Sequence, residues 1–183
     1  MKKEISGVTI ELRQGDIANQ TDCEAVVNAA NEQLETGGGV AGAIHRAAGP
    51  GLAKEAKPLG PIKPGEAVIT GAHDLPNKYV IHCLGPVYGQ DKPEDKLLTD
   101  CYKNALALAE GKRLISIAFP AISTGIFGYP AEEAAKVAFT SIIESISNLK
   151  HVKKIVFVLY SIQDLEVNKR VLEQIVQGKE YLG

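Results

Sequence analysis

Residues 114–130 read LISIAFPAISTGIFGYP. The first six of these residues are almost entirely apolar, which is typical of a strand buried on both faces of a sheet. Pro120 ends that strand, two glycines mark a loop, and Pro130 suits the first turn of a helix. The stretch therefore predicts a buried strand that is joined to a helix by a glycine-containing loop.

The same strand-to-helix alternation extends in both directions along the chain. Hydrophobic periodicity predicts strands at residues 8–13, 25–28, 67–70, 79–84, 114–119 and 155–160, and helices at residues 40–48, 52–57, 94–110, 130–149 and 164–177. Asp164 is the candidate N-cap of the last helix. The alternation predicts an α/β fold with three layers, α/β/α, and the length suits a single domain over residues 1–183.

Composition and charge limit the function. A formal net charge of -2 disfavours a general nucleic-acid binder, which normally carries a strong basic excess. No apolar run is long enough to span a membrane or to act as a signal peptide. The cysteines Cys23, Cys83 and Cys101 are odd in number and far apart, which argues against a disulfide framework and a zinc site. We expect a cytoplasmic monomer without a metal or cofactor.

A first glycine loop occupies residues 36–42, TGGGVAG, and runs into a predicted helix. Consecutive glycines can aim several N–H groups into one concavity, and the helix N-terminus adds partial positive charge. This pattern favours a phosphate or diphosphate, with a flexible surface turn as the alternative. The formal GxGxxG match lacks Rossmann spacing because residues 29–36 separate it from the strand, and no Lys-Ser or Lys-Thr follows Gly42 to make a P-loop.

A second glycine loop occupies residues 121–130. Its backbone amides and the hydroxyls of Ser123 and Thr124 are candidates to hold a phosphate from the other side. Phe127 lies in a turn-forming stretch between Gly125 and Gly128, so we expect its ring to face solvent or ligand, with capping of the core as the alternative. The central expectation is that both loops face one crevice and point their N–H groups at a diphosphate.

Five motifs together resemble the macro domain family: GDI at 15–17, VNAAN at 27–31, GGGV at 37–40, His82 in YVIH at 79–82, and PAISTGIFG at 120–128. Their order and spacing match over nearly the whole chain. The resemblance implies a mixed six-stranded sheet between helices and an ADP-ribose cleft across its crest.

The resemblance also implies residue roles. Asp16 would accept a hydrogen bond from the adenine amino group, the Ile17 backbone would fix the ring edge, and Tyr160 would stack on adenine. Asn31 would hydrogen-bond the distal ribose beside Phe127. Asp16 as a turn residue and Asn28 as a partner of backbone groups remain alternatives. The predicted ligand-binding set is Asp16, Ile17, Asn28, Asn31, Thr36, Gly37, Gly38, Gly39, Val40, Ala41, Ile122, Ser123, Thr124, Gly125, Ile126, Phe127, Gly128 and Tyr160.

The resemblance implies hydrolysis of ADP-ribosyl esters, either on mono-ADP-ribosylated Asp or Glu side chains or in O-acetyl-ADP-ribose. One hydrolase branch of the family carries an aspartate at the position of Ala41, so that carboxylate is lacking here. The predicted mechanism uses a water held by a substrate phosphate oxygen, with Asn31, Gly39 and Phe127 as the catalytic set. We expect slow turnover, because losing a general base costs ~10²–10⁴-fold.

Three alternative functions remain open at this level. The first is a non-catalytic reader of ADP-ribose or of ADP-ribosylated proteins, the second is an ADP-ribose 1″-phosphate phosphatase, and the third is a poly(A) or RNA binder. No other group offers better chemistry: His82 is interpreted as a satisfied core histidine, His45 as a packing or capping residue, and His73 and His151 as loop residues.

Overall fold

The structure is a computed structural model that describes the backbone of residues 1–182 and the side chains of residues 1–178. Its centre is a seven-stranded sheet with the order β1-β2-β7-β6-β3-β5-β4. The strands are β1 (Lys2–Ile5), β2 (Val8–Gln14), β3 (Ala25–Ala29), β4 (Ala67–Gly71), β5 (Tyr79–Cys83), β6 (Ser116–Phe119) and β7 (Lys154–Leu159). The two edge strands, β1 and β4, are antiparallel to their neighbours and the five between them are parallel, so the sheet is mixed as predicted.

The prediction of six strands is wrong by one, because it omits β1. This strand has four residues, alternates half-buried with exposed side chains, and pairs only with β2. Its hydrophobic signal is weak because ladder hydrogen bonds rather than burial hold it. Ser6 and Gly7 both have positive φ, 49° and 83°, which is the backbone of a two-residue hairpin turn. The Ser-Gly pair is the sequence signal that identifies this hairpin.

The helices are α1 (Gly39–Ala48), α2 (Pro50–Ala56), α3 (Glu94–Gly111), α4 (Ala131–Ser145) and α5 (Ile162–Leu182), with short 3-10 turns η1 (Lys57–Leu59) and η2 (Ile146–Asn148). All five predicted helices are present. The predicted N-cap Asp164 is wrong: α5 begins two residues earlier, and the Ser161 hydroxyl accepts the Asp164 N–H at 3.1 Å. Within residues 1–182, no helix has both the length and the apolar composition needed to cross a membrane.

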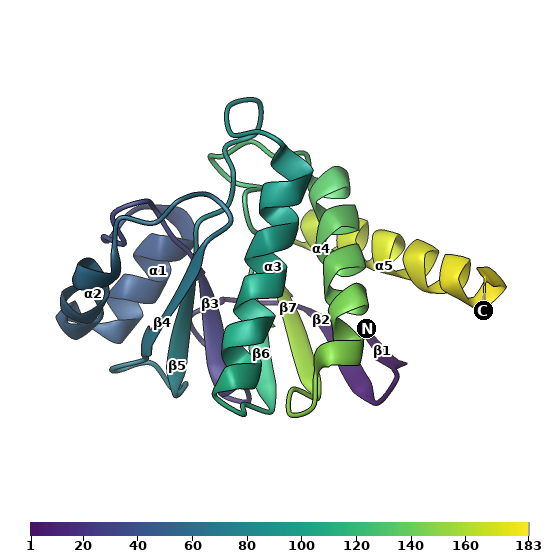
Figure 1. The fold of residues 1–183 in the computed structure, drawn as a ribbon, viewed down its shortest axis with the longest axis horizontal. Helices are drawn as coiled ribbons and strands as arrows, with labels where there is room; N and C mark the ends of the chain where they lie inside the picture. Colours follow the sequence, from purple (N-terminus) through teal and green to yellow (C-terminus); the bar gives the residue numbers. More distant parts are fainter. Residues whose placement is uncertain (183) are drawn as a thin grey trace.

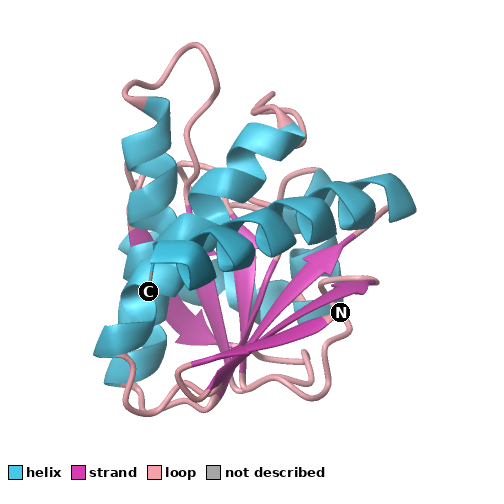
Figure 2. Ribbon diagram, turned by 90° about the vertical axis from the view of Figure 1, so that its right-hand side faces the viewer, coloured by secondary structure: helices cyan, strands magenta, loops and turns pink. Residues whose placement is uncertain are grey.

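Helices cover both faces of the sheet. Figure 1 shows α3 and α4 side by side in front of it and α1 with α2 at the left, and Figure 2 shows the long helix that ends at C crossing the sheet. Alternate strand residues divide the core: Val27 and Ile81 pack in the cluster that contains α3, α4 and α5 residues, whereas Val26 and Val80 pack in the cluster that contains α1 and α2 residues. This is the predicted three-layer arrangement.

The parallel strands end at one edge of the sheet. Gln14 pairs in register with Leu159, and Phe119 pairs with Phe157. The loops that follow β2, β3, β6 and β7 therefore leave the sheet together, at the upper edge in Figure 1. Ligands of open α/β sheets usually bind at such an edge.

Candidate functional site

One cavity of about 210 Å³ lies between the two glycine loops. It is lined by the end of β3 with the two residues after it, by the loop that starts α1, and by the loop after β6: Ala29, Ala30, Asn31, Gly37, Gly38, Gly39, Val40, Ala41, Ala121, Ser123, Gly125, Ile126 and Phe127. The loops thus share one crevice, as the sequence predicts. Ala29, Ala30 and Ala121 are additional lining residues that the predicted set omits, although all three lie within the quoted motifs.

The first loop presents free backbone donors. Helix α1 begins at Gly39 and has no side-chain cap, and its first ladder bond runs from the Gly42 N–H to the Gly38 carbonyl at 3.1 Å. The N–H groups of Gly39, Val40 and Ala41 have no acceptor among residues 1–182. Such groups carry the partial positive charge of a helix N-terminus. This end of the cavity is therefore suited to an anion.

The second loop is closed by its own backbone. The Gly128 N–H donates to the Gly125 carbonyl at 3.0 Å and the Tyr129 N–H donates to the Ser123 carbonyl at 2.9 Å. Ser123 has a φ of 69°, a left-handed conformation that costs a non-glycine residue about 1–3 kcal/mol. In the described part of the chain, the amides of residues 124–127 have no acceptor. Turns of this kind gather N–H groups into anion-binding concavities.

The hydroxyls of the second loop behave differently from the prediction. Thr124 donates its hydroxyl proton to the Ala121 carbonyl at 2.9 Å. The Ser123 hydroxyl is buried against Gly85, where an added Cβ atom would collide with it. Both hydroxyls thus face protein, and the backbone amides are the donors that this loop offers to the cavity.

The Asn31 side chain hydrogen-bonds to the backbone just before the first loop and also lines the cavity. Its Nδ2 donates to the Glu35 carbonyl at 2.8 Å, and its Oδ1 accepts the Glu35 N–H at 2.9 Å. An amide nitrogen has two protons, so one Nδ2 proton is uncommitted. Phe127 is half buried and packs against the cluster of Ala30, Leu34, Ala56, Ile62 and Leu84 while also lining the cavity. The two interpretations of Phe127, core cap and ligand contact, are therefore compatible.

Asp16 and Tyr160 follow neighbouring strands at the same edge but do not line the cavity. Asp16 is exposed, and one carboxylate oxygen accepts the Ala18 N–H at 2.9 Å while the other has no described partner. Asp16 thus acts as a turn residue and still has a free acceptor. Tyr160 is 88% exposed. A large aromatic ring that is almost fully exposed at the sheet edge where the cavity lies is available to a ligand.

Asn28 lies away from the cavity and is not a lining residue. It is 1% exposed, and its Nδ2 donates to His82 Nδ1 at 3.1 Å, while His82 Nε2 lies 2.9 Å from the Thr70 hydroxyl. Both ring nitrogens of His82 therefore have a partner inside the protein. Burial, reinforced by the nearby His45, lowers the pKa of His82 to about 4. His82 is thus the satisfied core histidine that the sequence predicts.

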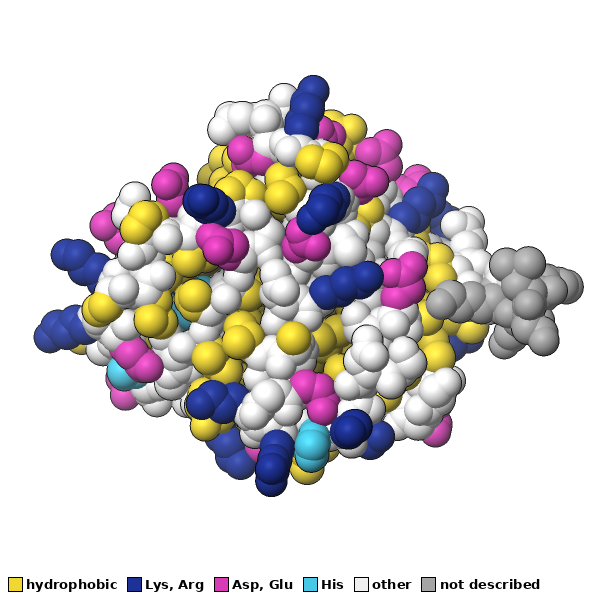
Figure 3. Space-filling view, in the orientation of Figure 1, with side chains coloured by type: hydrophobic (Ala, Val, Ile, Leu, Met, Phe, Trp, Pro, Cys, Tyr) yellow, Lys and Arg dark blue, Asp and Glu magenta, His cyan; other side chains and the backbone are white. Residues whose placement is uncertain are grey.

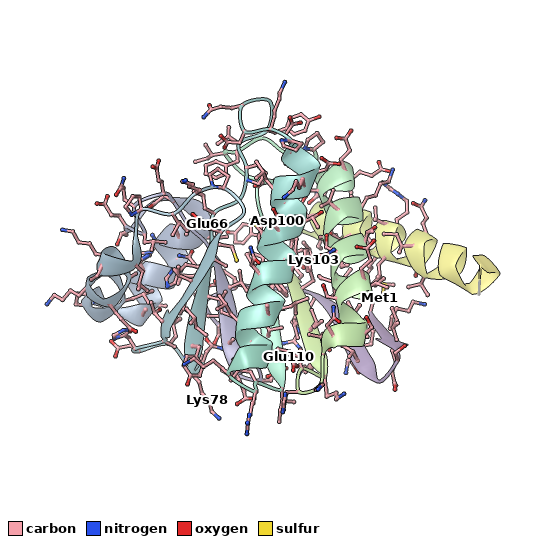
Figure 4. The ribbon with its side chains drawn as sticks, in the orientation of Figure 1. Met1, Glu66, Lys78, Asp100, Lys103 and Glu110 are labelled. Carbon is pink, nitrogen blue, oxygen red and sulfur yellow. The ribbon has the colours of Figure 1, made fainter. Side chains whose placement is uncertain are left out.

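The remaining predicted ligand-binding residues outside the lining are Ile17, Thr36, Ile122, Thr124 and Gly128. Within the part of the chain that the structure describes, the cavity lining includes no titratable side chain, and Ala41 contributes only a methyl group to it. Among the described residues, no cluster of His, Cys, Asp or Glu is arranged to hold a metal ion. The labelled charged residues Lys78 and Glu110 lie at the opposite end of the sheet (Figure 4), where basic side chains gather along the lower rim in Figure 3.

The comparisons with known proteins agree with this geometry. The macro domain family model matches residues 27–138, which include both glycine loops. A macro domain-containing protein of Chlorobaculum tepidum is 46% identical over 90% of this chain and 96% of its own. The O-acetyl-ADP-ribose deacetylase of Klebsiella pneumoniae strain 342 is 45% identical over 88% of this chain and 95% of its own.

Among solved structures, a variant of the Oceanobacillus iheyensis macrodomain with ADPR superposes with a TM-score of 0.92 and 38% identity, covering 97% of this chain and 98% of that one. The relatives are matched over nearly their whole length, and the shared region includes the strands, loops and helices that form the crevice. This chain belongs to the macro domain family.

Proposed function

We propose that this chain binds ADP-ribose in the crevice between its glycine loops and hydrolyses ADP-ribosyl esters. The observation that carries the proposal is the pair of loops whose unpartnered N–H groups border one cavity without a titratable side chain. A diphosphate supplies the acceptors that these donors lack. The deacetylase among the relatives and the ADPR-containing structure support the same ligand.

The size of the cavity suggests how ADP-ribose is accommodated. At about 210 Å³ the cavity is smaller than the 300–1,000 Å³ typical of a closed ligand site. The diphosphate and distal ribose would occupy it, and the adenosine would extend along the open edge towards Asp16 and Tyr160. The free Asp16 oxygen would accept the adenine amino group, and the Tyr160 ring would stack on the base. A carboxylate there would repel an additional phosphate on the proximal ribose.

The proposed chemistry relies on the substrate, because the cavity offers no general base. A phosphate oxygen of ADP-ribose would hold a water near the distal C1″ carbon, with the free Asn31 Nδ2 proton and the Gly39 amide nearby and Phe127 packed beside the ribose. For a modified glutamate, the water oxygen bonds to C1″ as the C1″–O bond breaks. The carboxylate leaves with the bonding electrons, and the water gives up a proton to the phosphate or to solvent.

A single-turnover assay tests the catalytic part of the proposal. We expect slow release of ADP-ribose from a glutamate-modified protein, above the buffer rate and reduced in Asn31→Ala. Release at the buffer rate would leave only a reader of ADP-ribose, a function that the lack of titratable groups in the cavity independently favours.

Calorimetry tests the ligand separately. ADP-ribose should bind more tightly than AMP or ADP, because these two lack the distal ribose, and more tightly than NAD, because NAD carries a nicotinamide ring at C1″ of that ribose. Equal affinity for ADP and ADP-ribose would refute the assignment of Asn31 and Phe127 to the distal ribose.

A further inference from the structure

A second, much smaller cavity lies behind the second glycine loop. Its volume is about 10 Å³, and its lining comes from the loop after β6 and from α3, α4, α5 and β7: Tyr102, Ala121, Thr124, Ala131, Ala134, Ala135, Phe157, Asp164 and Asn168. A volume of this size accommodates about one water molecule. Such a site is occupied by water only when polar groups surround it, so the polar lining residues decide its character.

Four polar residues line this cavity: Tyr102, Thr124, Asp164 and Asn168. The carboxylate of Asp164 has no partner within the described residues, and the other three have unused hydrogen-bonding capacity of their own. Asn168 is 3% exposed; its Nδ2 donates to the Asp164 carbonyl at 2.8 Å, and its Oδ1 has no partner within the described residues. The buried Tyr102 oxygen accepts the Ile122 N–H at 3.2 Å, but its own proton has no acceptor in the described structure. Thr124 uses its hydroxyl proton on Ala121 and keeps free lone pairs.

We propose that this cavity is a binding site for one internal water molecule. The water accepts the hydroxyl proton of Tyr102 and donates its two protons to Asn168 Oδ1 and to the Thr124 hydroxyl oxygen. Three hydrogen bonds are the usual number for a buried water. Every donor then has an acceptor, and the cost of leaving buried polar groups unpaired is removed.

The water also fixes the second glycine loop. Tyr102 already holds the Ile122 amide, and the water would hold Thr124, so both neighbours of the left-handed Ser123 are tied to α3 and α5. Tyr102 and Asn168 are therefore positioning residues for the amides of this loop. This second step rests on the proposed function, because it assumes that those amides bind the ADP-ribose diphosphate.

High-resolution crystallography of the wild-type protein tests the site itself. We expect electron density for one water within hydrogen-bonding distance of Tyr102, Thr124 and Asn168, and its loss in Asn168→Leu. A wild-type cavity without water, or a water retained in Asn168→Leu, would overturn the proposal. Magnetic relaxation dispersion, which counts long-lived waters in solution, should show one fewer in the variant.

Calorimetry with ADP-ribose tests the effect on the loop. Asn168→Leu and Tyr102→Phe should each raise Kd about 2- to 10-fold, the effect of one lost hydrogen bond. Both substitutions remove a hydrogen bond to the same water, so the double variant should lose less than the product of the two effects, although Tyr102→Phe also removes the acceptor of the Ile122 N–H. Ser145→Ala, which removes a buried hydroxyl on α4 outside both cavities, should leave Kd unchanged.

The outcomes separate the two proposals. Fully multiplicative effects, or unchanged Kd in both single variants, would refute the positioning role even with the water present. Failure of the wild-type protein to bind ADP-ribose would refute the proposed function and leave the water site intact.

Discussion

Gly42 lies in the first turn of α1, and replacing it with alanine should impair ligand binding. A Cβ atom at this position would stand 2.5 Å from the Gly37 carbonyl oxygen, about 0.9 Å closer than the shortest ordinary contact of 3.4 Å. The obstacle is backbone, so the Gly37 peptide must move, and the adjacent amides that line the cavity move with it. Loss of one charge-assisted hydrogen bond, about 1.5–3 kcal/mol, would weaken ADP-ribose binding about 10- to 150-fold.

The helix itself should gain from the same substitution, because alanine is favoured over glycine in helices by up to about 1 kcal/mol. Gly42→Ala should therefore retain most of its thermal stability while calorimetry shows the loss of affinity. Gly111→Ala is the matched control: Gly111 ends α3, and no atom lies within 4 Å of its added Cβ, so affinity should stay at the wild-type value. Binding by Gly42→Ala within twofold of wild type would show that loop geometry does not determine affinity.

Three further predictions concern other parts of the molecule. Tyr160→Ala should weaken ADP-ribose binding by about 1–3 kcal/mol through lost stacking without changing the melting temperature, since the ring is 88% exposed; unchanged Kd would exclude the stacking role. Asp16→Ala should weaken binding by about 1–3 kcal/mol, and an equal loss for an ADP-ribose analogue lacking the adenine amino group would contradict the proposed contact. The pKa of His82 is lowered to about 4, against an ordinary value of 6.5. Between these two pH values the unfolded chain therefore binds more protons than the folded protein. The free energy of unfolding should fall by about 2 kcal/mol from pH 7 to pH 5. Urea titrations should show a steeper slope in wild type than in His82→Gln, where only the burial-lowered pKa of His45 still contributes in the same direction; equal slopes would assign the effect to other groups.

The crevice is predictable from sequence because its determinants are local. A buried strand, a glycine-rich loop and a helix start follow one another twice, at Gly37–Gly39 and at Ser123–Gly128. Parallel strands then bring the two loops to the same edge without further information. The same locality explains why the five helices are found close to their predicted positions.

Sequence patterns do not predict the features that depend on contacts between residues far apart in the chain. Strand β1 has a weak hydrophobic pattern of its own, and apart from the Ser6-Gly7 turn signal it is recognisable only through its pairing with β2. The preference of Asn28 for His82 requires β3 and β5 to lie side by side, 54 residues apart in sequence. The orientation of the Ser123 hydroxyl depends on Gly85, and the polar lining behind Thr124 depends on Asn168 from α5. None of these contacts leaves a periodic pattern in the chain.

In the proposed function, affinity for ADP-ribose and turnover depend on different features of the site. Its anion-binding donors are backbone N–H groups, which no side-chain truncation removes, so affinity depends on backbone shape at a few positions: the crowded Gly42, the left-handed Gly39 with a φ of 53°, and the strained Ser123. In the proposed mechanism, turnover instead depends on one water, and the described lining of the cavity has no titratable side chain to activate it. Substitutions that deform the loops should thus abolish binding and catalysis together, whereas a change at Asn31 that leaves the loops intact should slow hydrolysis more than it weakens binding.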